Sequence, residues 1–163
     1  MIPTPLEPRP LGRRARLAAA LALAVSLAAS AGPPTRAEDA GETEARRSAR
    51  VFGQALTSGQ ASLLRTILPT AGKVHFAVPR IVPEEGWFTA SQLEALLADF
   101  LSQGSVRSFE VLRLESDGKT AAFARGRAVA TDRQGRPLRL GIHLAFEPED
   151  DRWILREIKE TLE

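Results

Sequence analysis

One amphipathic segment constrains the fold of this chain more than any other feature. Residues 89–103 begin with Thr89, a favourable N-cap, and Gln92 three positions later completes a capping-box pattern. Gly104 follows, and we expect it to end the helix in the left-handed conformation. The apolar residues recur at helical spacing and form one stripe that needs a covering surface: Leu93, Leu96, Leu97, Phe100 and Leu101.

Four strand-like segments follow this helix, and no further helical pattern separates them. Turn signals divide them, beginning with Asp117-Gly118 and continuing around Gly135 and over 148–151. Short hairpins of this kind force antiparallel neighbours. The pattern therefore predicts a four-strand antiparallel meander over 108–115, 120–131, 138–146 and 153–159.

Three more elements precede the amphipathic helix. Apolar residues at helical spacing predict helices over 42–56 and 60–68, and alternation predicts a strand over 73–78. The fold class expected from this order is α+β, with three helices packed on a curved antiparallel sheet. The order itself is helix-helix-strand-helix followed by the four-strand meander.

The N-terminus has the pattern of a secretory signal peptide. A basic region with four arginines precedes residues 17–31, which are uncharged and too short to cross a bilayer, since this takes about 20 residues. Ala29-Ser30-Ala31 predicts cleavage between Ala31 and Gly32, with Ala37 as an alternative site. We expect an exported protein, periplasmic or extracellular, that is free of the membrane after cleavage. Two alternatives stay open. The segment is either cleaved or retained as an N-terminal anchor, and export uses either the general or the twin-arginine route.

Removing residues 1–31 changes what the charge of the chain implies. The whole chain has 22 Lys plus Arg and 20 Asp plus Glu, and residues 1–31 contain four arginines and one glutamate. The remainder therefore has 18 basic and 19 acidic groups, so the basic character of the full chain is no argument for a nucleic-acid partner. The expected organisation is a signal peptide over 1–31, a disordered linker over 32–41 and a single domain over 42–163. The chain has no cysteine, so its core alone must stabilise it.

The order of elements resembles that of the nuclear transport factor 2-like superfamily, a cone-shaped α+β fold. The residues that carry this resemblance are 55–68 (ALTSGQASLLRTIL), 86–101 (GWFTASQLEALLADFL), 108–112 (SFEVL) and 152–163 (RWILREIKETLE). They are also similar to a bacterial family of exported domains of unknown function within that superfamily. The resemblance implies a pocket between the helices and the concave sheet face, and frequent dimerisation through the sheet.

The chain offers few groups for acid–base or metal chemistry. It has no tyrosine and only two histidines, His75 and His143, which lie far apart in the sequence. Metal-binding, nucleotide-binding and nucleophile motifs are absent, so we assign no catalytic residue, no metal ligand and no cofactor. The acidic turn 147–151 lacks the ligand spacing of a calcium loop and is read as a solvated turn.

Five residues are candidates for ligand binding: His75, Trp87, Arg125, Arg127 and His143. His143 alternates with the aliphatic residues of its strand, so we expect it on the outer surface of the sheet. Arginines 113, 125, 127, 139 and 156 are expected near one another on one sheet face. Such a face is either a solvated charged surface, a dimer interface or a platform for an anionic ligand. Trp87 is either part of the helix cap or the roof of a pocket mouth.

We therefore expect a domain that binds a small ligand or a protein partner without catalysis. One alternative is a pocket enzyme of the isomerase, dehydratase or hydrolase kind, using a buried carboxylate or His75. Another is a structural domain that forms a homodimer through the sheet face. A cavity with an inward-facing acid or histidine would favour the enzyme, and an interior filled by Phe, Leu and Ile would favour binding without catalysis.

Overall fold

The computed structural model describes residues 36–132 and 134–162. The expected signal peptide, its cleavage pair Ala31–Gly32 and the first part of the expected linker lie outside these residues. No helix within the described part of the chain has the length and hydropathy to cross a membrane. The described elements are α1 (Arg36–Ser58), the 3₁₀ helix η1 (Ala61–Thr66), β1 (Val74–Ala77), β2 (Gly86–Phe88), α2 (Ala90–Gln103), β3 (Ser105–Ser116), β4 (Ala122–Thr131), β5 (Pro137–Glu149) and β6 (Arg152–Thr161).

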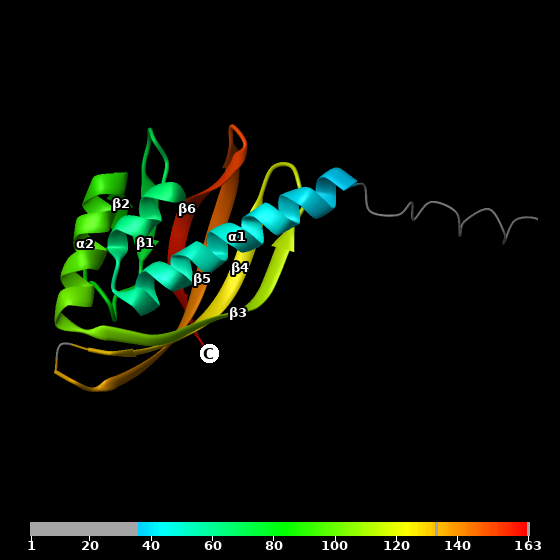
Figure 1. The fold of residues 1–163 in the computed structure, drawn as a ribbon. Helices are drawn as coiled ribbons and strands as arrows, with labels where there is room; N and C mark the ends of the chain where they lie inside the picture. Colours follow the sequence, from blue (N-terminus) through cyan, green and yellow to red (C-terminus); the bar gives the residue numbers. More distant parts are fainter. Residues whose placement is uncertain (1–35, 133, 163) are drawn as a thin grey trace, which may run out of the picture. The chain divides into compact units, whose positions relative to one another are not determined.

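The first helix is longer than its apolar pattern predicts. It begins at Arg36, so residues 36–41 of the expected disordered linker are helical. A helix can continue past its apolar stripe because its hydrogen bonds are internal. In Figure 1 this helix lies across the sheet, and its principal sheet neighbour is β3.

The sheet has six strands in the order β2-β1-β6-β5-β4-β3 and is curved (Figure 1). The meander from β3 to β6 is antiparallel throughout, as predicted. One pairing differs from the expected antiparallel sheet, because β1 runs parallel to β6, with His75 opposite Glu157. These two strands are far apart in the sequence, so no hairpin determines their relative direction.

The short strand β2 was not predicted. Its three residues, Gly86 to Phe88, pair antiparallel with β1 and place Trp87 opposite His75. Three residues are too few to show the alternation of a strand. Trp87 and Phe88 also directly precede the N-cap of α2, where they resemble the apolar residues that often flank a helix start. Phe88 does pack towards the core, where its ring lies 6.3 Å from that of Phe76.

The core lies between the inner sheet face and the helices. The predicted stripe of α2 faces it, with Leu93, Leu97 and Phe100 buried and Leu96 and Leu101 partly buried. Ser48 on α1 is the one buried polar side chain among the described residues, and its hydroxyl donates to the Trp153 carbonyl at 2.8 Å. The largest fully buried side chains are Phe52, Phe76, Phe100, Phe146, Leu64, Leu68, Leu93, Leu97, Leu140, Ile142, Leu144 and Ile154. The core is therefore filled with apolar side chains.

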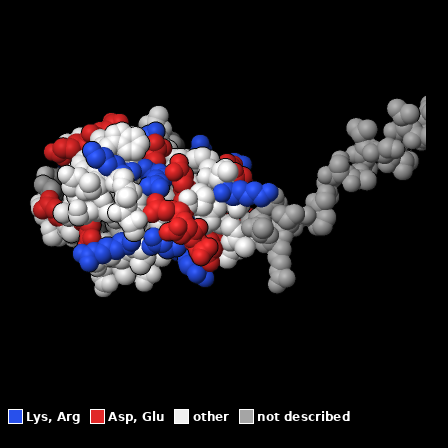
Figure 2. Space-filling model, turned by 90° about the horizontal axis from the view of Figure 1, so that it is seen from above, with Lys and Arg blue, Asp and Glu red and all other residues white. Residues whose placement is uncertain are grey.

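The surface seen in Figure 2 has charges of both signs next to one another. Several ion pairs join residues that are close in sequence, such as Arg46–Glu42 at 2.6 Å and Arg136–Asp132 at 2.7 Å. Neither sign dominates this view, in agreement with the nearly balanced charge of the chain after residue 31.

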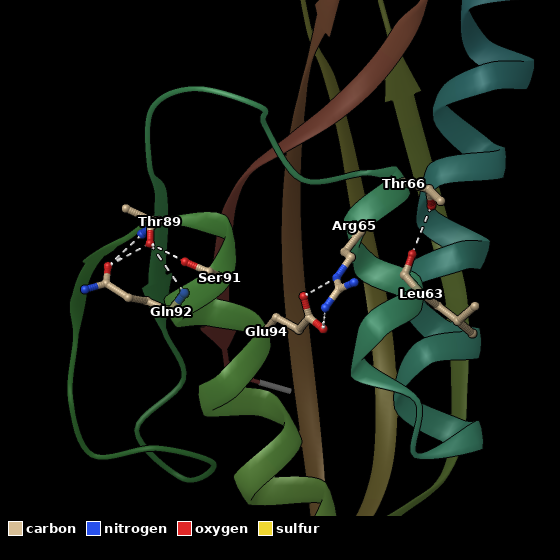
Figure 3. A network of polar contacts seen from close by, with 7 residues as sticks. All are labelled: Leu63, Arg65, Thr66, Thr89, Ser91, Gln92 and Glu94. Carbon is tan, nitrogen blue, oxygen red and sulfur yellow. Dashed lines mark hydrogen bonds and ion pairs between the residues drawn. The ribbon is translucent and has the colours of Figure 1, made fainter.

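A capping box starts α2, as predicted. The Thr89 hydroxyl accepts a hydrogen bond from the Gln92 backbone, and the Gln92 side chain accepts one from the Thr89 backbone at 2.9 Å (Figure 3). The same view shows Arg65 of η1 paired with Glu94 of α2 through two hydrogen bonds of 2.7 and 2.9 Å. These contacts define where α2 begins and join it to η1.

Gly104 ends α2 by a different mechanism from the one predicted. Its φ of −130° and ψ of −170° are extended, not left-handed. A Cβ atom at this position would lie 2.6 Å from the Thr131 carbonyl oxygen on β4. Glycine is therefore required here by the close approach of two backbones. The hairpin glycines Gly118 and Gly135 do adopt positive φ, at 72° and 78°.

Candidate functional site

All five candidate residues lie on the outer face of the sheet, opposite the helices. Paired residues on neighbouring strands project to the same side, and the register places His75 opposite Trp87, Arg125 opposite His143, and Arg127 opposite Gly141. The residues that alternate with them, such as Val74 and Ile142, are buried against the helices. We call the surface formed by these five residues with Phe123, Glu157 and Lys159 the outer face.

A shallow hollow of about 190 Å³, which we call the central hollow, lies over β4 and its neighbours β3 and β5. The His143 and Phe123 rings stack there, with centroids 5.8 Å apart and an interplanar angle of 22°. Phe123 is 45% exposed. The hollow is lined by Arg113, Glu115, Phe123, Arg125 and His143. An aromatic surface and basic groups are therefore available together to a partner.

The pKa of His143 lies below its ordinary value. Partial burial is the main cause, because it disfavours the charged imidazolium. Glu157 acts in the opposite direction, while the positive charges of Arg125 and Lys159 lower the pKa further. At neutral pH the ring is therefore uncharged and can accept as well as donate a hydrogen bond.

The arginines of the outer face differ in how they are paired. Arg113 lies 2.5 Å from Glu115 on the same strand. Within the described residues, Arg125 has no ion-pair partner. Arg156, expected with this group, lies beside the β5–β6 turn and pairs with Glu147 at 3.2 Å and Glu149 at 2.8 Å. Arg125 is thus the guanidinium that the central hollow leaves available for an anionic group.

His75 and Trp87 form a second cluster on the same face. Their ring centroids are 5.0 Å apart, and Trp87, at 62% exposed, covers the His75 ring. The carboxylates of Glu85 and Glu157 lie 3.7 and 3.5 Å from the two ring nitrogens, and the buried Nδ1 has no hydrogen-bond partner. This cluster exposes a large aromatic surface beside acidic groups.

The structure brings together two of the predicted site residues directly, Arg125 and His143, and places His75 with Trp87 in the neighbouring cluster. Arg127 lies beside the central hollow, on the same strand as Arg125. Sequence reasoning did not select Phe123 or Glu157 as site residues. Phe123 alternates along β4 with Arg125 and Arg127, and this pattern could have identified it. Glu157 was expected among the charges of the arginine face, but its contact with His75 depends on the parallel pairing of β1 with β6.

The interior between the helices and the inner sheet face is packed with apolar side chains. Phenylalanine, leucine and isoleucine side chains fill it, and its one buried polar group, within the described residues, is the Ser48 hydroxyl. The same part of the chain contains no group of three acidic or histidine side chains arranged to hold a metal ion. The five candidate residues therefore lie outside this interior, on the outer face of the sheet.

Comparison with known proteins connects the chain to solved structures alone. No family model and no curated protein matches it. A five-substitution variant of a protein named Rd1NTF2_05 is 16% identical, with a TM-score of 0.56, covering 72% of this chain and 96% of that one. A DUF4783 family protein from Bacteroides uniformis is 18% identical, with a TM-score of 0.55, covering 70% and 97%. An LEH-like epoxide hydrolase from M. tuberculosis is 15% identical, with a TM-score of 0.54, covering 73% and 82%.

These similarities establish the fold. The chain has the nuclear transport factor 2-like fold, and the expected resemblance to a bacterial family of unknown function is confirmed at the level of structure. Among the similar proteins are both a family without a known activity and an epoxide hydrolase. The fold is therefore compatible with binding and with catalysis, and the site must decide between them.

Proposed function

We propose that this protein is a non-catalytic binding domain that is exported from the cytoplasm and pairs with a second copy of itself through the outer face. The observation that carries the proposal is that the candidate residues and two exposed aromatic rings gather on a sheet face that none of the described helices covers. Trp87 and Phe123 are 62% and 45% exposed on this face. Large aromatic side chains in such positions are common anchors of protein interfaces.

The charges of the outer face suit pairing with an identical surface. Two-fold symmetry brings each residue of a patch opposite another residue of the same patch, so a self-associating surface needs both signs. Arg125 on β4 has no ion-pair partner among the described residues, and the exposed carboxylate of Glu85 lies beside His75 and Trp87. Glu157 in the same region is already paired with Lys159 at 2.8 Å. A two-fold axis between these regions would place the basic part of one copy against the acidic part of the other.

A small anionic ligand is the second candidate for the same surface. The central hollow of about 190 Å³ presents the Arg125 guanidinium beside an uncharged imidazole and an aromatic ring. A carboxylate or phosphate could accept hydrogen bonds from both side chains. The pocket-enzyme alternative has less support, because the buried side chains of the interior are apolar and, among the described residues, include no carboxylate or histidine.

Light scattering coupled to size-exclusion chromatography tests the proposed dimer. The mature protein should elute with the mass of two chains. Phe123→Glu should shift it towards the mass of one chain, because the substitution removes an exposed aromatic anchor from the interface. Ala98→Glu introduces the same charge on the exposed face of α2 and should leave the dimer intact.

Circular dichroism of both variants checks that the fold is preserved. A wild-type protein that stays monomeric at high micromolar concentration would overturn the dimer. In that case, amide shifts around Arg125 and His143 on addition of inorganic phosphate would support the small-ligand candidate.

A further inference from the structure

A second surface, on the helix side of the sheet, has the composition of a ligand site. It is a groove of about 370 Å³ between α1 and the edge strand β3. Along α1 its wall is formed by Arg46, Arg50, Gln54 and Thr57, which recur at helical spacing on one side of the helix. Phe109 and Val111 of β3 form the opposite wall, and Gly53 of α1 lies against Phe109 at the floor. Volume and lining fall within the range of small-molecule sites, which begins at about 300 Å³.

At the floor of the groove, two glycines pack closely against one aromatic ring. A Cβ atom at Gly53 of α1 would lie 2.6 Å from the Phe109 ring, and one at Gly126 of β4 would lie 2.5 Å from it. Phe109 also meets Phe52 edge to face, with centroids 5.4 Å apart. The ring is thus held between helix and sheet, with one part contacting the core and another lining the groove.

The walls of the groove are basic. The lining residues include two arginines and no carboxylate. Arg46 is held by Glu42 at 2.6 Å, whereas Arg50 has no ion-pair partner within the described residues. One turn further along α1, Gln54 adds an amide group to the same wall. A free guanidinium beside an aromatic floor recognises an anionic group attached to an apolar body.

We infer that this groove binds a small amphiphilic anion, a carboxylate or sulfonate that carries an aromatic or short alkyl body. The anionic group lies between Arg50 and Gln54, and the apolar body lies on Phe109 and Val111. The site is separate from the outer face, because Phe109 and Val111 project to the helix side of β3, as do their partners Ala128 and Gly126 on β4. Its occupancy therefore does not depend on the proposed dimer.

Titration of the full mature protein with naphthoate, followed by amide NMR, tests the inference. We expect saturable shifts of the Gly53, Gln54, Phe109 and Val111 amides. Arg50→Gln should weaken binding about tenfold, because it removes one charge-assisted hydrogen bond to the anionic group. Arg139→Gln, which removes an exposed arginine of β5, is the matched control and should leave the affinity unchanged.

Two further measurements separate this site from non-specific binding. Gln54→Trp fills the groove from an exposed helix position and should abolish the shifts while the circular dichroism spectrum is unchanged. Naphthalenemethanol, the uncharged analogue of naphthoate, should bind more weakly than naphthoate. The inference is overturned if naphthoate causes no shifts, if the shifts map to Phe123 and His143, or if Arg50→Gln and Arg139→Gln have equal effects.

Discussion

At the scale of single residues, His143 shows how the position of a side chain on the sheet changes its pKa. Its strand neighbours Ile142 and Leu144 are buried, while the His143 ring lies on the outer face against Phe123. Partial burial and the positive charges of Arg125 and Lys159 lower its pKa, although Glu157 acts against them. The sequence predicted the side of the sheet correctly, but not the aromatic contact or the direction of the pKa shift.

We predict that the His143 imidazole titrates below the ordinary histidine value of about 6.5. At pH values between the folded and the unfolded pKa, His143 binds more protons in the unfolded chain than in the folded one. The free energy of unfolding therefore decreases as the pH falls through about 6.5. The effect is absent above that range and complete below the folded pKa. NMR titration of the ring checks the pKa, with His143→Gln identifying the resonance. A pKa at or above the ordinary value would contradict the prediction.

At the scale of elements, α2 demonstrates what a clear amphipathic pattern can predict. Its cap, its apolar stripe and its contact with the core all agree with the sequence analysis, whereas the way it ends does not. Gly104 was interpreted as a left-handed helix end, but Thr131 on a distant strand is what excludes a side chain there. A sequence pattern can predict local backbone geometry. It cannot predict a contact with a residue that is distant in the sequence and is brought near only by the tertiary structure.

We predict that Leu97→Ala lowers the free energy of unfolding by about 2–5 kcal/mol, because it removes a buried side chain and leaves a cavity. Leu97 is 1% exposed and central in the stripe of α2. Leu112→Ala is the matched control, since Leu112 is 52% exposed on β3 and should change stability by less than about 0.5 kcal/mol. Urea denaturation measures both, and equal midpoints for the two variants would show that the α2 stripe does not support the core.

At the scale of the whole molecule, the N-terminal segment carries the predicted export signal and the described domain carries the proposed binding surfaces. The described domain begins at Arg36, and the predicted signal peptide and its cleavage site precede it. We propose that the mature protein acts outside the cytoplasm, where its balanced charge and packed core support binding through the two open surfaces.

We predict that exported protein begins at or near Gly32, because Ala29-Ser30-Ala31 has the small-residue pattern that signal peptidase accepts. N-terminal sequencing of material recovered outside the cytoplasm checks this. Protein that starts at Glu38 would instead indicate cleavage after Ala37, and an intact Met1 on exported material would contradict the prediction.

The sequence by itself determined the fold class and the order of all the elements except β2, because helix and strand periodicity and turn residues act over a few neighbouring positions. It also placed His143 on the outer face, since alternation along a strand assigns each residue to one side. Trp87 was expected in the helix cap or at a pocket mouth, and its pairing with His75 on the outer face depends on β2. Tertiary structure alone decided the parallel pairing of β1 with β6, the short strand β2 and the groove beneath Arg50. Each of these depends on residues far apart in the chain, whose contacts follow from packing and leave no local signal.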